Sequence, residues 1–437
     1  MASPGEPRTE PSSDGQAGLD ARRVALAVVM AALDRRGGLE EALATPAFAR
    51  LEPRDRGFAR ALAMTVLRRK GELDRVLAAR LEKSPPEPVL ALLRLGAAQL
   101  LHMEVPSHAA VATTVELAGQ GKGTERFKSL VNAVLRKIAG GGASPTPVEA
   151  LAPDWLYARW RSAYGEEAAL AMAAMIAEEP ATDLTLRDEV DADALAETLP
   201  GAVLPGGSLR TPRRGELSEW PGFEEGRWWV QDASAAIPAR LLGVKPGETA
   251  LDLCAAPGGK ALQLAAASAA LVALDRSAAR VERLKQNFQR IRLAAEFVVA
   301  DALSWHDDRP FDAVLLDAPC TATGTFRRHP DVLWASRPSD IVKLAQVQSA
   351  MLEAAAERVR PGGRLVYCVC SLEQEEGEGQ IEAFLAARGD FCIDALAPGE
   401  GGSPPRSLTL DGALRILPCH LQGGTDGFFI ARMARLP

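Results

Sequence analysis

The chain has 437 residues, 47% of them hydrophobic and 24% charged, and its formal net charge is −7. This composition is that of a soluble globular protein, long enough for about two to three domains. No apolar run approaches the roughly 20 residues that cross a bilayer, which excludes a membrane-spanning protein. Residues 1–17 are polar and lack the apolar core of a signal peptide, so we expect a disordered tail and a cytoplasmic location.

Charge is distributed unevenly along the chain. Residues 51–140 carry 15 Lys and Arg against 9 Asp and Glu, a local charge of +6, so the remainder carries −13. A basic module joined to an acidic one is compatible with RNA binding through one face. A solvated helix surface explains the same charges equally well, so composition leaves the partner open.

Residues 18–140 are predicted to form one all-helical domain, because apolar residues recur at three- and four-residue spacing. The predicted helices cover 19–33, 54–69, 73–81, 88–103, 109–118 and 125–138. Residues 140–145 have the composition of a linker. Residues 146–230 are predicted to form a small α+β extension, with helices at 154–160 and 166–177 and strands at 182–186 and 228–230.

Residues 231–437 are predicted to form an α/β domain, a doubly wound parallel sheet with helices on both faces. The predicted strands are 249–254, 271–274, 296–299, 313–316 and 364–369, and the helices are 261–267, 278–291 and 341–360. We expect Ser277 to cap the second helix and residues 426–431 to form a last antiparallel strand. Ligands on such sheets lie at the carboxyl ends of the strands.

The loop after the first of these strands consists mostly of small residues. Glycine lets the backbone approach a ligand, and the start of the following helix attracts a negative group. An ordinary strand–helix connection has the same composition, and the loop matches neither common nucleotide-binding glycine motif. The residues predicted to bind a nucleotide-like ligand are Cys254, Ala255, Ala256, Pro257, Gly258, Gly259 and Lys260.

Acidic residues follow three consecutive strands of this predicted sheet. Asp275 ends the second strand, where a carboxylate can accept hydrogen bonds from ribose hydroxyls. Asp301 follows the third strand, within reach of an adenine-like ring, and Asp317 ends the fourth. Each of them alone can be a helix cap or a turn residue. Together with the glycine loop, they predict a nucleoside site.

Six cysteines are scattered along the chain without a C-x-x-C pair, and there are only five His, so we expect neither a disulfide framework nor a metal site. Cys320 and Cys370 are the informative ones, because each follows a predicted strand on the ligand side of the sheet. Ser371 is expected to cap an acidic helix, and a helix start stabilises a nearby thiolate. A small buried cysteine remains the alternative for either residue.

Two thiols beside a nucleoside site suit methylation of cytosine at C5. C5 is a poor nucleophile until a thiolate adds to C6, and an acid near N3 stabilises the charge that this addition creates. Asp317 is the predicted acid. A base then removes the C5 proton, the thiol is eliminated, and the second cysteine can assist its release.

Several motifs of the chain resemble the Sun/Fmu-type ribosomal RNA cytosine-5 methyltransferases. The N-terminal region is similar to the NusB RNA-binding fold, notably over 106–117 and 127–136. The resemblance covers about residues 20–436. The methyltransferase motifs that carry it are Leu251–Lys260, Asp317–Gly324, Arg327–Asp331, Cys370-Ser371 with Glu375-Glu376, Gln231–Ser234 and the Asp-Gly-Phe-Phe of 426–429.

The resemblance implies a Rossmann-like class I methyltransferase domain that uses S-adenosylmethionine, bound by Cys254–Lys260, Asp275, Asp301 and Asp317. It implies Cys370 as the nucleophile and Cys320 as the residue that assists release. The implied substrate is 16S (small-subunit) ribosomal RNA, and we expect a monomer. The loop residues Arg327, Arg328 and His329 are expected to contact RNA phosphates, with a solvated loop as the alternative.

Two other readings stay open. In the DNA-methylating pattern the cysteine that follows a proline attacks, which would make Cys320 the nucleophile. In a non-enzymatic RNA-binding adaptor, only the NusB-like domain would be active. One departure from the family pattern stands out, because Cys368-Val369-Cys370 replaces the usual single cysteine. Strand alternation is expected to place Cys368 and Cys370 on the same side.

Overall fold

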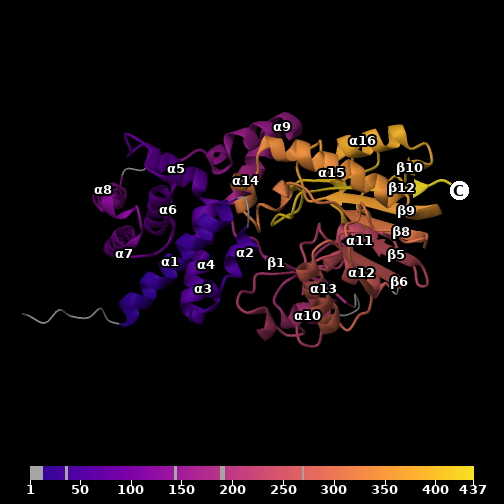
Figure 1. Cartoon of the computed structure of the whole chain (residues 1–437), viewed down its shortest axis with the longest axis horizontal. Helices are drawn as coiled ribbons and strands as arrows, with labels where there is room; N and C mark the ends of the chain where they lie inside the picture. Colours follow the sequence, from indigo (N-terminus) through magenta and orange to yellow (C-terminus); the bar gives the residue numbers. More distant parts are fainter. Residues whose placement is uncertain (1–12, 35–37, 142–144, 188–191, 268–269) are drawn as a thin grey trace, which may run out of the picture. The chain divides into compact units, whose positions relative to one another are not determined.

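The computed structural model describes residues 13–34, 38–141, 145–187, 192–267 and 270–437 (Figure 1). It contains two compact units. The first lies within residues 1–162 and also includes 176–178 and 329–335; the second comprises 163–175, 179–328 and 336–437. Of the predicted tail, residues 1–12 lie outside the described ranges, as do residues 142–144 of the predicted linker.

The first unit is all-helical, as predicted. Its long helices are α1 (Ser13–Leu33), α4 (Pro53–Arg68), α5 (Lys70–Ala78), α6 (Glu87–His102), α7 (Ser107–Gln120) and α8 (Lys128–Ala139). Leu62, Leu93 and Val131 are fully buried in the shared core. Helices α6 and α8 pack closely at Gly96, where a Cβ atom would lie 2.6 Å from Leu135 Cδ1. A larger residue at this crossing would require the Leu135 side chain to move.

Three short helices of this unit were not predicted: α2 (Leu39–Leu43), α3 (Pro46–Ala49) and α14 (Asp331–Ala335). Helix α14 is far away in sequence, and specific contacts hold it in the unit. The Leu39 amide donates to Asp331 Oδ2 at 3.1 Å, and Trp334 Nε1 donates to the Leu67 carbonyl at 3.2 Å. The Lys70 ammonium lies 4.3 Å from the centroid of the Trp334 ring. Sequence periodicity cannot detect helices of one turn held in this way.

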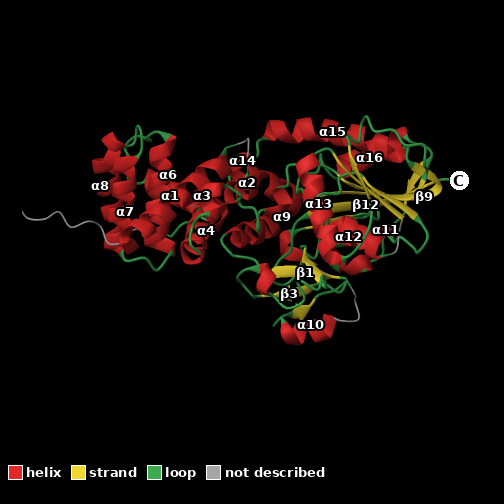
Figure 2. Cartoon of the chain, turned by 60° about the horizontal axis from the view of Figure 1, so that its bottom comes forward, coloured by secondary structure: helices red, strands yellow, loops and turns green. Residues whose placement is uncertain are grey.

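The extension contains a small antiparallel sheet in the order β2-β3-β1-β4 (Figure 2). Its elements are β1 (Thr182–Leu186), α10 (Ala192–Thr198), β2 (Ala202–Val203), β3 (Leu209–Thr211) and β4 (Trp228–Val230). The two helices predicted before it form α9 (Asp154–Ile176), which is interrupted at Gly165 with φ 84°. Both predicted strands, 182–186 and 228–230, are present with the predicted bounds.

The second unit also contains the main sheet, in the order β10-β12-β9-β8-β5-β6-β7, with β11 paired to β12. Strands β9, β8, β5, β6 and β7 run parallel to one another, whereas β12 is antiparallel to both its neighbours β9 and β10. The predicted antiparallel last strand is thus confirmed. The strands are β5 (Thr249–Asp252), β6 (Ala270–Asp275), β7 (Glu296–Val299), β8 (Phe311–Asp317), β9 (Val359–Val369), β10 (Phe391–Ile393), β11 (Leu414–Ile416) and β12 (Phe428–Arg435).

Helices cover both faces of this sheet, which confirms the doubly wound prediction (Figure 2). One face packs on α11 (Ile237–Leu242), α12 (Gly259–Ala266) and α13 (Ala278–Ile291), and the other on α15 (Pro338–Ala356) and α16 (Glu378–Ala387). Ser277 caps α13, accepting from the Arg280 amide at 3.4 Å. No helix among the described residues is both long and apolar enough to span a membrane.

Candidate active site

The glycine loop leads from β5 into α12 at the carboxyl edge of the sheet. Gly258 has φ 122°, and a Cβ atom there would lie 2.8 Å from Leu284 Cδ1, so only glycine fits. Helix α13 fixes the loop from the side: Arg280 donates to the Ala256 carbonyl, and Asn287 Nδ2 donates to the Pro257 carbonyl at 2.9 Å. The loop is therefore a rigid backbone surface next to the strand ends.

The acids predicted at the second and third strand ends lie on adjacent strands. Asp275 is buried; its Oδ1 accepts from the Ser277 amide at 3.0 Å, and its Oδ2 lies 3.3 Å from Arg280 Nη1. Asp301 is exposed and accepts from the Leu303 amide at 2.9 Å. The Ala300 amide donates to the Asp275 carbonyl at 3.2 Å, which joins the two strand ends. A two-acid edge of this kind suits a ribose and an adjoining ring.

Asp317 lies between a lysine and a cysteine. Lys260 Nζ is 2.7 Å from Asp317 Oδ2, and Cys368 Sγ lies 3.4 Å from Asp317 Oδ1. Burial is the largest single effect on Lys260 and would lower its pKa, but the charge and hydrogen bond of Asp317, together with the nearby Cys368 and Cys370, outweigh it and the pKa is raised. Lys260 is thus a permanent cation that orients Asp317, although the two residues are 57 positions apart.

Asp252 is a buried acid at the end of β5 that the sequence analysis included in a motif but did not assign to the site. Burial, reinforced by the charge of Asp317, raises the pKa of Asp252 to about 7. Its Oδ1 accepts from the Cys254 amide at 3.2 Å. Burial, followed by the charge of Asp252, also raises the pKa of Cys254, so this thiol stays protonated. The sequence signal that could have identified Asp252 is an acidic residue at the end of an apolar strand.

Replacing Asp252 by Asn should remove part of the pH dependence of the free energy of unfolding. The folded pKa of about 7 exceeds the unfolded value of about 3.9, so the folded state binds the extra proton and stability falls as pH rises between these values. The stability of the wild type relative to Asp252→Asn should therefore fall by up to about 1.4 kcal/mol per pH unit from pH 4 to 7, then level off. Urea unfolding of both proteins measures this, and a pH-independent difference would contradict it.

The two predicted cysteines are brought together. Cys320 Sγ lies 3.5 Å from Cys370 Sγ, although 50 residues separate them. The hydrogen bond with Cys370, followed by burial, raises the pKa of Cys320, which therefore keeps its proton. Burial, followed by the charge of Asp317, raises the pKa of Cys368 as well. Cys370 itself is partly exposed.

The prediction that Ser371 caps a helix is wrong. Helix α16 begins at Glu378, so Cys370 does not lie at a helix start and gains no stabilisation from one. Instead, Ser371 Oγ accepts from the Glu373 amide at 3.0 Å and donates to the Glu376 carboxylate. The chain forms no α-helix between Ser371 and the start of α16 at Glu378. The Glu376 side chain points into the interior instead, where it is fully buried.

The predicted RNA-contacting residues make contacts within the protein. Arg327 is only 5% exposed and donates to the Gly423 carbonyl at 2.6 Å, so it does not present its charge at the surface. Arg328 pairs with the buried Asp426 of the Asp-Gly-Phe-Phe motif. His329, in the helical unit, lies 3.8 Å from Glu40. Their RNA contacts stay a prediction, and the structure gives the two arginines a role in holding loops.

The Gln231–Ser234 motif and the 426–429 motif are joined at the buried carboxylate of Asp232. Asp232 Oδ1 accepts from the Ser234 amide at 2.9 Å, from Thr425 Oγ1 at 2.9 Å and from the Asp426 amide at 3.0 Å.

Within the described ranges, no group of three or more His, Cys, Asp or Glu side chains is arranged to hold a metal ion.

The parallel strands, the glycine loop and the antiparallel β12 together define a Rossmann-like methyltransferase fold. The chain belongs to the RsmB/F family of ribosomal RNA methyltransferases. The family model described as 16S rRNA methyltransferase RsmB/F matches residues 239–434, and that of the NusB family matches residues 19–140. The resemblance noted from the motifs is therefore confirmed for both regions.

Relatives and solved structures agree with this assignment. The Ribosomal RNA small subunit methyltransferase B of Xylella fastidiosa (strain Temecula1) is 38% identical, covering 96% of this chain and 98% of the relative. The protein of the same name from Pseudomonas syringae pv. tomato is 34% identical, covering 96% and 97%. The solved structure of PH0851 is 24% identical with a TM-score of 0.76, covering 98% and 100%, which shows a common fold.

Proposed function

We propose that the chain methylates C5 of a cytosine in 16S ribosomal RNA, using S-adenosylmethionine and a covalent bond from Cys370 to C6. The observation that carries the proposal is the pair of sulfur atoms, 3.5 Å apart, at the ends of β8 and β9. Methylation at carbon requires such a nucleophile, because the C5=C6 bond of cytosine is otherwise unreactive. The relatives' name, Ribosomal RNA small subunit methyltransferase B, supports the substrate class.

The residues at the strand ends fit S-adenosylmethionine, which when bound supplies an electrophilic methyl group. The backbone of Cys254–Lys260 can approach the ligand closely because Gly258 and Gly259 carry no side chain, and a Cβ at Gly259 would lie tightly, 3.1 Å from the Gln231 side chain. Asp275 and Asp301 are the residues that we propose for the ribose and the adenine ring. Arg280, 51% exposed, lies over Asp275 and has to turn aside for a ribose to reach it.

The protein groups divide the reaction between them. Cys370 gives up its thiol proton to solvent and its Sγ adds to C6, so the electron pair of the C5=C6 bond makes C5 nucleophilic, with negative charge spreading toward N3. A proton from solvent neutralises this charge at N3, and Asp317, oriented by Lys260 at 2.7 Å, is the group proposed to deliver it and then accept a hydrogen bond from the N3–H. After C5 has accepted the methyl group, loss of the C5 proton re-forms the double bond and expels the sulfur. Cys320 is close enough to that sulfur to assist its departure.

The decisive test is to identify the modified nucleotide. Small-subunit RNA from a strain lacking this protein should be incubated with the purified chain and S-adenosylmethionine, then sequenced after bisulfite treatment. We expect one cytosine to become resistant to deamination, and RNA affinity to fall steeply with salt because Lys and Arg contact phosphates. No resistant cytosine together with no S-adenosylmethionine binding in calorimetry would overturn the proposal in favour of an RNA-binding adaptor.

A further inference from the structure

A cluster of buried polar side chains lies next to the two cysteines, and none of its members takes part in the reaction proposed above. Its members come from three places: the loop after β8 (Thr321), the middle of α15 (Gln348) and the loop after β9 (Ser371 and Glu376). Gln348, Ser371 and Glu376 are 0% exposed and Thr321 is 8% exposed. Polar groups buried to this degree are costly unless they are paired, and among the side-chain polar atoms of these four residues only Gln348 Oε1 has no hydrogen-bond partner.

Glu376 is the centre of this cluster. Its Oε1 accepts from the Thr321 amide at 3.0 Å and from Gln348 Nε2 at 2.9 Å. Its Oε2 accepts from the hydroxyls of Thr321 and Ser371. An ionised carboxylate accepts at about four positions and donates none, so these partners match its capacity. Because each hydroxyl has one hydrogen, both are committed to Glu376.

The partners of Glu376 are the direct neighbours of the reactive sulfurs. Thr321 follows Cys320, and Ser371 follows Cys370, so one carboxylate holds the loop of each cysteine. Gln348 extends this hold, since its Nε2 also donates to the Pro319 carbonyl at 2.9 Å, just before Cys320. The Cys370 carbonyl in turn accepts from the Gly324 amide at 3.0 Å.

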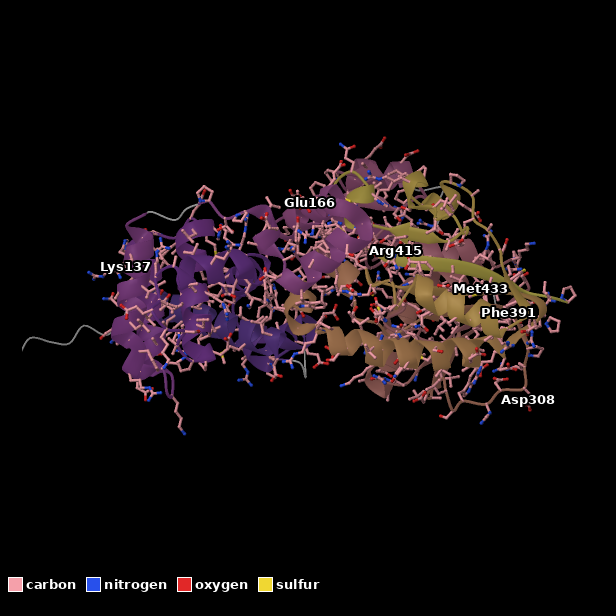
Figure 3. All side chains as sticks on the ribbon, turned by 90° about the horizontal axis from the view of Figure 1, so that it is seen from above. Lys137, Glu166, Asp308, Phe391, Arg415 and Met433 are labelled. Carbon is pink, nitrogen blue, oxygen red and sulfur yellow. The ribbon has the colours of Figure 1, made fainter. Side chains whose placement is uncertain are left out.

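The turn that carries Glu376 is held in place by residues of two neighbouring strands. Tyr367, fully buried in β9, donates from its hydroxyl to the Glu376 carbonyl at 2.6 Å. Arg415 on β11, labelled in Figure 3, donates to the Ser371 carbonyl and pairs with Glu378 at the start of α16. The turn that carries Glu376 is therefore anchored on both sides, and it cannot follow one cysteine loop away from the other.

We propose that Glu376 is a positioning residue that clamps the two cysteine loops together and so holds Cys320 and Cys370 in register. The expected effect of this clamp on the reaction rate rests on the proposed function, whereas its effect on the distance between the two sulfur atoms does not. A misplacement of about 1 Å of a reacting group can cost about 10²-fold in rate. The ladder of β8 and β9 ends at Asp317 and Cys368, so beyond it the contacts of Glu376, beside the bond from the Gly324 amide to the Cys370 carbonyl, hold the loops that keep the sulfur atoms 3.5 Å apart.

The geometric consequence is tested with phenylarsine oxide, whose arsenic bridges two nearby thiols by forming two As–S bonds with release of one water. Glu376→Gln should bind this probe at least threefold more weakly than the wild type, because its amide has a single acceptor oxygen and cannot accept at both the Oε1 and the Oε2 positions. Glu375→Gln removes the same charge from an exposed neighbour and should bind like the wild type. Cys370→Ser sets the level for binding without a bridge.

The catalytic consequence is tested on the same variants. Glu376→Gln should lower kcat about tenfold or more and leave the KM for S-adenosylmethionine within about twofold of the wild type. Ser371→Ala removes the hydroxyl that donates to Glu376 and accepts from the Glu373 amide. This variant should shift both measurements in the same direction, and it decides the matter if Glu376→Gln does not fold. Unchanged arsenical affinity in a folded Glu376→Gln protein overturns the inference. If arsenical affinity falls while the wild type methylates no RNA, the clamp stands and the proposed function fails.

Discussion

Replacing Cys370 by Ala is expected to abolish methyl transfer, by at least about 10³-fold, and to prevent any covalent complex with RNA that contains 5-fluorocytosine. Fluorine at C5 cannot leave as a proton would, so elimination of the sulfur is blocked and the protein–RNA bond persists. Without the Cys370 sulfur that bond cannot form. Denaturing gel electrophoresis of radiolabelled RNA with each protein measures the complex directly.

The opposite result is expected when Cys320 is replaced by Ala. Cys370 can still add to C6, but its departure loses the neighbour that lies 3.5 Å away, so the covalent complex should accumulate even on unmodified cytosine. Cys392→Ala, which removes an exposed cysteine of β10, is the matched control and should behave like the wild type. Adducts that vanish with Cys320→Ala and persist with Cys370→Ala would make Cys320 the nucleophile.

Secondary structure was predictable wherever it follows from local pattern. Helix α13 has the predicted bounds because Val281, Leu284, Phe288 and Ile291 form a stripe that is buried on the sheet. Strand β7 is also found at 296–299, as predicted. The start of α16 was misplaced because an acidic stretch with a Ser before it matches a helix start, whereas long-range contacts pull Glu376 inward.

The candidate site was predictable to the level of strand ends and no further. The parallel topology places residues that follow β5, β6 and β8 at one edge, so Lys260, Asp275 and Asp317 could be proposed together. The contacts between residues on opposite sides of the site could not be predicted. The partner of Asp317 is 57 residues away, and Glu376 binds residues 28 and 55 positions away. Nothing in the spacing of these residues encodes which of them meet.

Changing Asp317 to Asn should lower the rate of methyl transfer at saturating S-adenosylmethionine by about 10²–10³-fold. The amide keeps the shape of the side chain but removes the charge that faces Lys260 at 2.7 Å, and it cannot share a proton with N3 of the cytosine. Lys260 is then left as a buried cation without its partner, so some loss of thermal stability should accompany the loss of rate. Single-turnover kinetics with excess enzyme measure the rate without product release.

A second carboxylate separates chemistry from cofactor binding. Asp275→Asn changes a residue two strands away, beside Arg280, and should weaken S-adenosylmethionine binding in calorimetry while leaving the single-turnover rate at saturation nearly unchanged. Asp317→Asn should show the reverse pattern. If Asp317→Asn instead weakens cofactor binding and keeps its rate at saturation, then Asp317 only holds the cofactor. The charge at N3 would then have to be stabilised by another group, and Lys260, which contacts Asp317 at 2.7 Å, is the first to test.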